Sequence, residues 1–253
     1  MSYWGFDTAS AVDSDLINCL AVSGAPANQI GFILRYIDAR DGVHAALTKP
    51  EASYIHCLGI SIGLIYGSVP HSLLGFNEGA QAANQASALA QALGVPTYVG
   101  IYADLGTSYD SYVTAGFMMG WAWQLSVNTP YHPGFYGNVG TDPDFDSAFA
   151  EACGDPDYGY YVTQSLLWSS EPEPSGCTGN SGMPAYRPNE PPESGYGQPP
   201  VWQYAENCGC TIDEDQSTLA PGNYRWWHPL GRKDRDTGPF KGVRPGSKDR
   251  TVR

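Results

Sequence analysis

The stretch Gly-Val-Pro-Thr-Tyr-Val-Gly-Ile-Tyr-Ala-Asp-Leu-Gly, residues 94–106, carries the signals that decide the fold. A long Ala-rich helical pattern, Asn77 to Leu93, leads into it. Gly94 is a natural helix C-cap, and Pro96 cannot continue a helix. A run of β-formers follows and ends on one carboxylate, Asp104. A helix, a tight turn and a strand that ends in an acid form one unit of a parallel α/β fold.

Similar units lie on both sides of this stretch. Further strand-like segments are Tyr3–Thr8, Gln29–Ile37, Ser61–Val69, Gly134–Gly137, Tyr160–Ser169, Val201–Tyr204 and Thr211–Asp215. Helical patterns separate most of them, at Ser10–Val22, after a capping box at Thr48–Glu51, at Ser108–Gln124 and at Asp144–Ala152. About eight alternating units predict an α/β fold, a (β/α)8 TIM-like barrel that need not be regular. An open doubly wound sheet is the alternative, but no Gly-rich nucleotide fingerprint follows the first strand.

Charge and composition divide the chain into a barrel, residues 1–221, and a basic C-terminal extension, residues 222–253. The barrel contains a Pro/Gly-rich loop at residues 173–200. It holds 23 of the 26 acidic residues but only four of the 13 Lys and Arg residues, so we expect no nucleic-acid binding by this acidic body. The basic extension, with Trp226 and Trp227 at its root, is a candidate contact for a protein partner.

The sequence shows no membrane span and no Sec signal peptide. No apolar run is long enough to cross a bilayer, and no basic n-region or apolar h-region follows Met1.

The six cysteines lie in two kinds of context. Cys19 and Cys57 lie in apolar, element-like segments and are expected to be buried free thiols. The other four lie in or beside loops, which allows one or two disulfides among Cys153, Cys177, Cys208 and Cys210. The Cys-Gly-Cys spacing is not that of a zinc site, and the five His residues show no metal-ligand spacing, so we expect no metal and no cofactor.

Acidic residues follow the ends of several predicted strands, and in a barrel these ends share one rim. The acids are Asp7, Asp38, Asp104, Glu171 and Asp213. Two carboxyl groups in an aromatic-lined cleft are what glycoside hydrolysis needs, one protonated and one ionised. Candidate aromatic platforms for sugars are Tyr36, Tyr66, Tyr102, Trp168 and Trp202. The ordinary alternatives are that such acids cap helices, as Asp104 would cap a helix starting near Ser108, and that the aromatics belong to the core.

Several segments together resemble the glycoside hydrolase-like domain of bacteria and phages, which is related to the family 25 glycoside hydrolases, the lysozyme-type muramidases. The matching motifs, in chain order, are Tyr3-Trp4-Gly5-Phe6-Asp7-Thr8-Ala9-Ser10, Arg35-Tyr36-Ile37, Leu47-Thr48-Lys49-Pro50-Glu51, Gly79 to Pro96, Trp202-Gln203-Tyr204 and Ile212-Asp213. Each motif alone is weak, but their order and spacing are fairly specific over residues 3 to about 216.

This resemblance implies a barrel with a glycan of the peptidoglycan type in its cleft. Asp7 matches the first-strand acid and Asp213 the last-strand acid. The muramidase Asp-x-Glu falls on Tyr102-Ala103-Asp104, so Tyr102 replaces the first acid and a shorter Asp104 replaces the glutamate proposed as proton donor. The candidate catalytic residues are therefore Asp104, Asp7 and Asp213, and the candidate substrate-binding residues are Tyr36, Tyr66, Tyr102, Glu171, Trp202 and Gln203.

Two hypotheses follow from these observations. The first is a muramidase-like glycosidase that acts on or binds cell-wall glycan. The second is a non-catalytic glycan-binding or structural component of a larger assembly, such as a phage particle, anchored by residues 222–253. Both place the protein outside the cell, in the cell envelope or on a virion.

Overall fold

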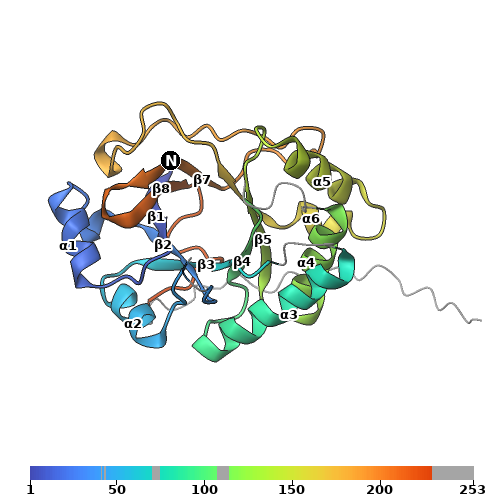
Figure 1. Cartoon of the computed structure of the whole chain (residues 1–253), viewed down its shortest axis with the longest axis horizontal. Coiled ribbons are helices and arrows are strands. Elements are labelled where there is room, and N and C mark those ends of the chain that lie inside the picture. The colour runs from blue at the N-terminus through green and yellow to red at the C-terminus, as the bar shows by residue number, and fades with distance from the viewer. Residues whose placement is uncertain (41, 43, 70–74, 107–113, 230–253) are drawn as a thin grey trace, which may run out of the picture.

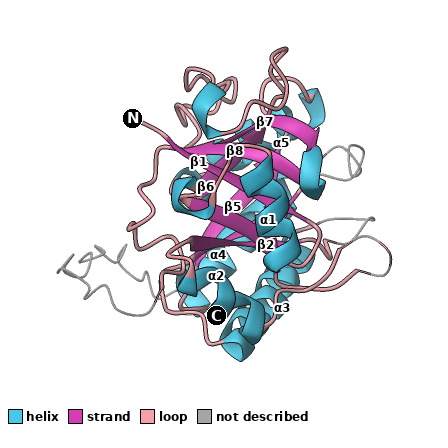
Figure 2. Cartoon of the chain, turned by 90° about the vertical axis from the view of Figure 1, so that its left-hand side faces the viewer, coloured by secondary structure: helices cyan, strands magenta, loops and turns pink. Residues whose placement is uncertain are grey.

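The structure, a computed structural model, describes residues 1–40, 42, 44–69, 75–106 and 114–229. Eight strands close into one barrel in sequence order (Figures 1 and 2). The strands are β1 (Tyr3–Thr8), β2 (Phe32–Tyr36), β3 (Ser61–Tyr66), β4 (Gly100–Asp104), β5 (His132–Gly137), β6 (Leu166–Ser170), β7 (Val201–Cys208) and β8 (Ile212–Ser217). The predicted (β/α) barrel is therefore confirmed.

The last strand runs against the others. Neighbouring strands from β1 to β7 are parallel, whereas β8 is antiparallel to both β7 and β1. The expectation of a fully parallel ring is wrong here, because only Gly209–Thr211 separate β7 from β8. Such a short connection makes a hairpin, and a parallel crossover needs a dozen or more residues. The start of β8 therefore lies at the same rim as the C-terminal ends of the other strands.

Helices cover the outside of the barrel from β1 to β6. They are α1 (Ser14–Val22), α2 (Lys49–Cys57), α3 (Phe76–Leu93), α4 (Ala115–Asn128), α5 (Pro143–Gly154) and α6 (Gly159–Thr163). The predicted end signals are confirmed: Thr48 and Glu51 form the capping box of α2, and Gly94 ends α3 in the left-handed conformation with φ 85°. The first part of the helix predicted from Ser108 lies outside the described residues.

One predicted strand begins with a helix instead. The segment Tyr160–Ser169 contains helix α6 followed by β6, so its first half was assigned wrongly. The packing of Gly159–Thr163 against α5 favours a helix over the strand that its β-forming residues predict. A Cβ at Gly159 would lie 2.3 Å from the carbonyl oxygen of Cys153, so only glycine allows this close approach.

The alternation of side chains along the strands makes two apolar cores. Outward-facing residues pack against the helices in the larger core. The smaller core fills the barrel interior with Phe32, Leu34, Ile65, Tyr102, Leu166, Trp168, Val201 and Trp226. The polar side chains at the rim where the parallel strands end lie beyond this apolar filling.

The start of the predicted extension closes the opposite end of the barrel. Trp226 is 1% exposed and stacks on Phe32 with ring centroids 4.9 Å apart. Trp227 and Ile62 exchange two backbone hydrogen bonds of 2.9 Å. Trp226 therefore fills the barrel interior, and Trp227 is buried in the outer core with its ring edge-on to His56 of α2, so neither side chain is available to dock on a partner as the sequence suggested. Residues 230–253 lie outside the described part of the chain.

Two disulfides confirm one part of the cysteine prediction, a bridge between two loop cysteines, and correct another part, the free thiol expected at Cys19. Cys19 pairs with Cys210, and Cys177 pairs with Cys208. Cys19 was expected to be a free thiol. It lies on an exposed position of α1 rather than on the apolar stripe, and there it meets the β7–β8 turn. Cys57 is free as expected, but it is exposed rather than buried.

The Pro/Gly-rich loop 173–200, which includes the short 3-10 helix η3 (Asn180–Gly182), lies over the outer wall of β7 and β8, where no α-helix stands among the described residues (Figure 1). Glu214, facing outward from β8, anchors this loop by accepting hydrogen bonds from the backbone N–H groups of Thr178 and Gly179. Met183, Tyr186 and Tyr196 pack from the loop onto the outer core. The loop thus covers the wall that a helix would cover in a regular barrel.

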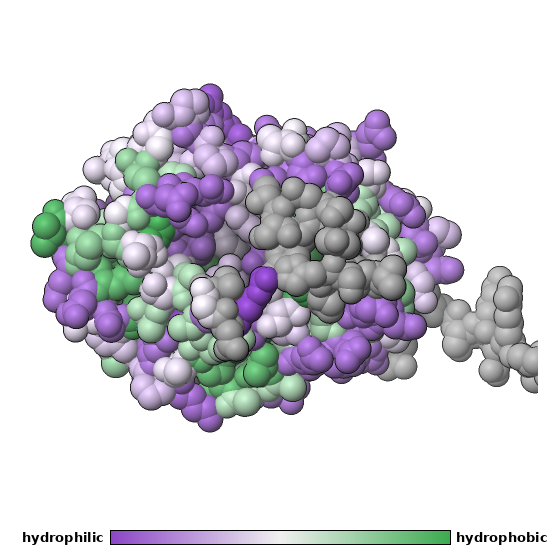
Figure 3. Space-filling view, in the orientation of Figure 1, coloured by the Kyte–Doolittle hydropathy of each residue, from purple (hydrophilic) through white to green (hydrophobic). Residues whose placement is uncertain are grey.

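Within the described residues, no helix is both long and apolar enough to cross a bilayer. Hydrophilic residues dominate the face of the molecule shown in Figure 3.

Candidate active site

Three aspartates from distant parts of the chain face the barrel interior at one rim. Asp7 is near the end of β1, Asp104 ends β4, and Asp213 is the second residue of β8. Asp7 and Asp213 are direct neighbours across the β1–β8 pair. Asp213 was expected at the C-terminal end of a strand. It reaches the rim from the N-terminal end instead, because β8 is antiparallel. We call this rim, with its inward-facing side chains, the mouth.

Gln203 of β7 joins two of the aspartates. Its Nε2 donates to Asp7 Oδ2 at 2.7 Å and to Asp213 Oδ2 at 3.4 Å. These two carboxylate oxygens are therefore no further apart than the two distances combined. That limit is below the separation of about 6.5–9.5 Å that inverting glycosidases need for a water between their carboxyl groups. Asp7 and Asp213 are therefore too close together to be the acid and base of an inverting glycosidase.

Asp104 stands on the other side of the mouth. Its Oδ2 accepts from the hydroxyl of Tyr36 at 3.2 Å, and its Oδ1 accepts from the N–H of Gly106 at 3.3 Å. Burial raises the pKa of Asp104, and these two hydrogen bonds oppose that rise. Helix α4 has Thr114 as its N-cap, so Asp104 does not cap it.

Tyr36 is held from behind by His44 and Asp38. The rings of Tyr36 and His44 stack with centroids 4.0 Å apart, and His44 Nε2 lies 3.7 Å from Asp38 Oδ1. Burial is the main cause that lowers the pKa of His44. Asp38, a predicted strand-end acid, thus lies behind the mouth, where it also accepts from the N–H of Gly67 at 3.0 Å.

A fourth aspartate lies one layer deeper. Asp215 is fully buried and accepts from Trp168 Nε1 at 2.9 Å. Burial raises the pKa of Asp7 well above its usual value, and the charge of Asp213 raises it further. Burial also raises the pKa of Asp215, followed by the charge of Asp7. Burial in the interior therefore favours the protonated form of Asp7 and Asp215 over the charged form.

The only cation of β2 is turned away from this acidic cluster. Arg35 is fully buried on the outer face, where its Nε lies 2.7 Å from Glu51 Oε1 of α2. Its other nitrogens donate to the carbonyl oxygens of Thr8 and Ala45, at 2.8 and 3.1 Å. Arg35 thus joins β1, β2 and α2 near the rim without neutralising the mouth.

The structure brings five of the nine candidate site residues together at the mouth: Asp7, Asp104, Asp213, Tyr36 and Gln203. Tyr102 lies deeper, fully buried with its ring edge-on to Trp168. The remaining three are on the outer face of the wall. Tyr66 donates to Gln85 of α3, Trp202 donates to the carbonyl oxygen of Glu171, and Glu171 accepts from the N–H of Asn189 in the loop. Burial raises the pKa of Glu171 to about 7.

Sequence reasoning missed Tyr136, Asp215 and Glu206. Tyr136 of β5 faces the mouth and donates to Gln203 Oε1 at 2.7 Å. Strand alternation carried the signal for two of them, because Tyr136 lies opposite Asp104 in register and Asp215 is two residues from Asp213 on the same face. The same rule would have placed Tyr66 and Trp202 outside. Glu206 follows an irregularity in β7 that alternation does not reveal.

No group of three or more His, Cys, Asp or Glu side chains in the described residues is arranged to hold a metal ion. A cavity of about 520 Å³ opens beside β1, lined mainly by the segments Ala11–Ser14 and Ala45–Thr48, with Tyr54 and Glu51. None of the three aspartates of the mouth lines it.

A closed barrel with clustered carboxyl groups at the C-terminal rim defines a glycoside hydrolase-like protein. The chain belongs to the family described as Rv2525c-like, glycoside hydrolase-like domain, which matches residues 25–191. The resemblance seen in the sequence is thereby confirmed.

Solved structures agree with this assignment. An uncharacterized protein from B. stearothermophilus is 29% identical, with a TM-score of 0.75 over 84% of this chain and 94% of that one. The Tat-secreted protein Rv2525c of Mycobacterium tuberculosis is 21% identical, with a TM-score of 0.54 over 89% and 98%. A muramidase from Acremonium alcalophilum is 15% identical, with a TM-score of 0.51 over 84% and 92%. The last two share the fold. No curated protein matches the chain.

Proposed function

We propose that this protein is a glycosidase that cleaves the glycan of bacterial peptidoglycan, with Asp104 as the general acid. The observation that carries the proposal is the meeting of Asp7, Asp104 and Asp213 at one mouth. Similarity to a muramidase fold supports the substrate class. The alternative of a non-catalytic component is not favoured, because both tryptophans expected to dock on a partner are buried, Trp226 in the barrel interior and Trp227 in the outer core.

The chemistry needs a carboxylic acid that still holds a proton at working pH. Asp104 meets this need because burial raises its pKa, and it would give its proton to the leaving glycosidic oxygen. Asp7 and Asp213, joined by Gln203, would share one negative charge, which would stabilise the positive charge that develops on the sugar ring. The hydroxyls of Tyr36 and Tyr136 would contact the substrate between these groups.

Two features support activity outside the cytoplasm. Structural disulfides persist in oxidising compartments, and this barrel carries two. One similar protein is described as Tat-secreted. We therefore place the protein outside the cell or in the cell envelope. A virion location and a protein partner for the basic residues of the extension stay predictions.

Replacement of Asp104 by Asn tests the proposal. We expect release of reducing ends from purified peptidoglycan to fall by about 10²–10⁴-fold, the usual contribution of general acid catalysis, with the melting temperature retained. Asp157→Asn, at an exposed position in the turn between α5 and α6, is the control and should match the parent. An Asp104→Asn variant as active as the parent would contradict the assignment.

A further inference from the structure

The hairpin between β7 and β8 carries a further carboxylate of the mouth, that of Glu206. The register between the two strands shifts twice, between Gln203 and Ala205 and again between Ala205 and Cys208. Such bulges bend a strand and redirect a side chain, often beside an active site. Glu206 and Asn207 are both exposed, while the other six residues of β7 are buried.

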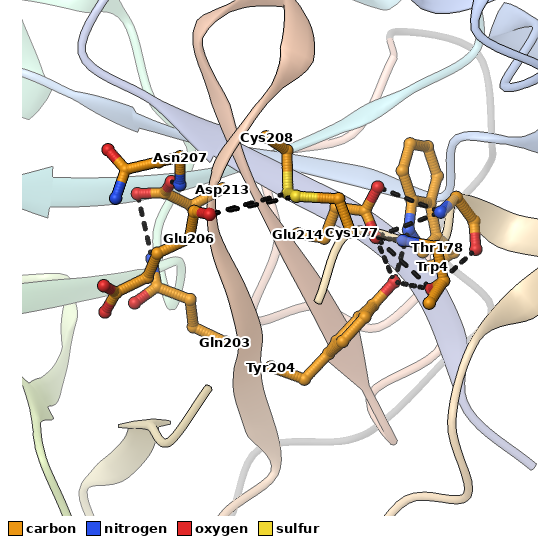
Figure 4. The surroundings of a disulfide bond; sticks show 11 residues. Trp4, Cys177, Thr178, Gln203, Tyr204, Glu206, Asn207, Cys208, Asp213 and Glu214 are labelled. Carbon is orange, nitrogen blue, oxygen red and sulfur yellow. Dashed lines mark hydrogen bonds between the residues drawn. A yellow bond between two sulfur atoms is a disulfide. The ribbon is translucent and has the colours of Figure 1, made fainter. Parts of the chain in front are cut away.

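The bulge turns the side chain of Glu206 toward the end of the neighbouring strand β6, at the mouth. Its Oε1 accepts from the hydroxyl of Ser170 at 3.0 Å, and Ser170 is the register partner of Gln203 at the end of β6. Figure 4 shows Gln203, Glu206 and Asp213 on one side of the hairpin, with Tyr204 and Glu214 on the other. Glu206 therefore belongs to the inward-facing set, although its place in the sequence alone does not reveal this.

The negative charge of Glu206 acts on two other residues of the mouth, Asp213 and Tyr136. Its charge helps to raise the pKa of Asp213, after burial. The pKa of Tyr136 is raised well above its usual value by burial, then by Asp7 and Asp104, and also by Glu206. Tyr136 thus shares its surroundings with carboxylates from β1, β4 and β7.

The hairpin tip is held in a demanding conformation. Three non-glycine residues have positive φ, namely Asn207 (54°), Cys210 (68°) and Thr211 (59°). Such backbone persists only where the surroundings enforce it, and it clusters at functional sites. Disulfides at Cys208 and Cys210 fix the tip on both sides, and the N–H of Asn207 donates to Asp213 Oδ1 at 2.5 Å.

Glu206 is also the carboxylate of this group best placed to meet a solvent molecule. Asp7 is 6% exposed, and Asp215 is fully buried. Asp213 accepts hydrogen bonds on both oxygens, from Asn207 and Gln203. Glu206 is exposed, and one of its oxygens accepts from Ser170.

We propose that Glu206 is a catalytic residue, the base that activates water on the β7 side of the mouth while Asp104 acts from the β4 side. This assignment rests on the proposed function. The water oxygen bonds to the anomeric carbon as the glycosidic C–O bond breaks. Glu206 takes the proton of the water, and Asp104 gives its proton to the leaving oxygen. The missing acid of the fourth strand is thereby supplied from the seventh.

The test compares Glu206→Gln with Glu190→Gln, an exposed glutamate of the loop, in the full-length oxidised protein. With purified peptidoglycan, we expect Glu206→Gln to lower kcat by 100-fold or more and to change KM by less than threefold. Gln retains an acceptor for Ser170, so the melting temperature should match the parent. The low-pH limb of the kcat profile should disappear, because the base is gone, while the high-pH limb set by the acid stays.

Chemical rescue separates catalysis from a structural role. Azide needs no base, so Glu206→Ala with sodium azide should form a glycosyl azide detectable by mass spectrometry, and Asp104→Asn should not be rescued on this substrate. An active parent with an unchanged Glu206→Gln rate and profile would overturn the role of Glu206 and leave the proposed function standing. A parent that releases no reducing ends would overturn both.

Discussion

Asp104 and Asp7 differ in how far each is removed from water, and this difference separates their roles. Asp104 is partly exposed at the mouth, where it accepts a hydrogen bond from Tyr36, so a substrate oxygen can reach it. Asp7 is 6% exposed and is coupled to Asp213 and Asp215. Burial among other carboxyl groups favours the neutral form of Asp7, whereas Asp104, at the surface of the cluster, is placed to exchange a proton with substrate.

The buried Asp215 makes stability depend on pH in a predictable direction. Its folded pKa lies above its unfolded value near 3.9, so the folded state binds more protons and stability falls as pH rises through the folded pKa. The slope for one such group reaches about 1.4 kcal/mol per pH unit. Asparagine imitates the protonated acid, and its oxygen can still accept from Trp168.

We therefore expect Asp215→Asn to flatten the decline of melting temperature as the pH rises above the unfolded pKa of about 3.9, and to be at least as stable as the parent at the high-pH end of the series. Thermal melts across that range measure this. Asp157→Asn should keep the parental slope. A variant that declines as steeply as the parent would show that Asp215 does not hold a proton in the folded state.

At the scale of elements, the sequence predicted the parts whose signals are local. The helix ends at Thr48–Glu51 and Gly94 and the strand that ends at Asp104 needed only capping and periodicity. The direction of β8 was missed, although the three residues Gly209–Thr211 are too few for a parallel crossover. The pairing of Cys19 with Cys210 was not predictable, because it joins segments 191 residues apart.

The site residues divide in the same way, into those with a local sequence signal and those whose direction depends on strand pairing. The positions of Asp7 and Asp104 were predictable because the C-terminal ends of parallel strands share a rim once a barrel is assumed. Asp213 reaches that rim for a different reason, because β8 is antiparallel and Asp213 lies near its start. Glu206 was not, because its direction depends on a bulge that only the pairing of β7 with β8 reveals. Trp202 was placed in the site because aromatic residues suit sugars, but the pleat turns it outward, under Tyr186 of the loop.

The two disulfides should contribute unequally to stability. A cross-link restricts the unfolded chain more as the loop it closes grows, and the sequence separations are 191 and 31 residues. We expect loss of Cys19–Cys210 through paired Ser substitutions to cost about 5 kcal/mol, and loss of Cys177–Cys208 about 4 kcal/mol. Denaturant titrations of the two double variants measure the difference. Equal midpoints, or the reverse order, would contradict the unfolded-chain explanation.

At the scale of the molecule, the barrel is open for chemistry at one end and closed at the other. Carboxyl groups collect at the mouth, while Trp226 fills the interior from the opposite end and lies against Phe32 and Gly63. A Cβ at Gly63 would lie 2.5 Å from the Trp226 ring, so glycine at this position makes room for the tryptophan. The segment from Asn223 to Trp227 therefore completes the barrel that the sequence seemed to end at residue 221.

This arrangement predicts that a chain ending at residue 221 cannot keep the native fold, although the charge pattern suggested that the barrel would stay folded without residues 222–253. Truncation removes two buried tryptophans, and truncating one such side chain to alanine costs about 3–5 kcal/mol. It also removes the hydrogen bonds between Trp227 and Ile62 and leaves the N–H of Gly100 without its partner at Arg225.

The matched control ends at Pro229 and keeps every described residue, so the comparison isolates the segment 222–229. We expect the chain 1–229 to melt cooperatively and to retain near-ultraviolet circular dichroism, and the chain 1–221 to lose both or to melt at least 10 °C lower. Trp226→Ala in the full-length chain should lower the free energy of unfolding by about 3–5 kcal/mol. Equal melting temperatures for the two truncated chains would mean that the barrel is complete without Trp226 and Trp227.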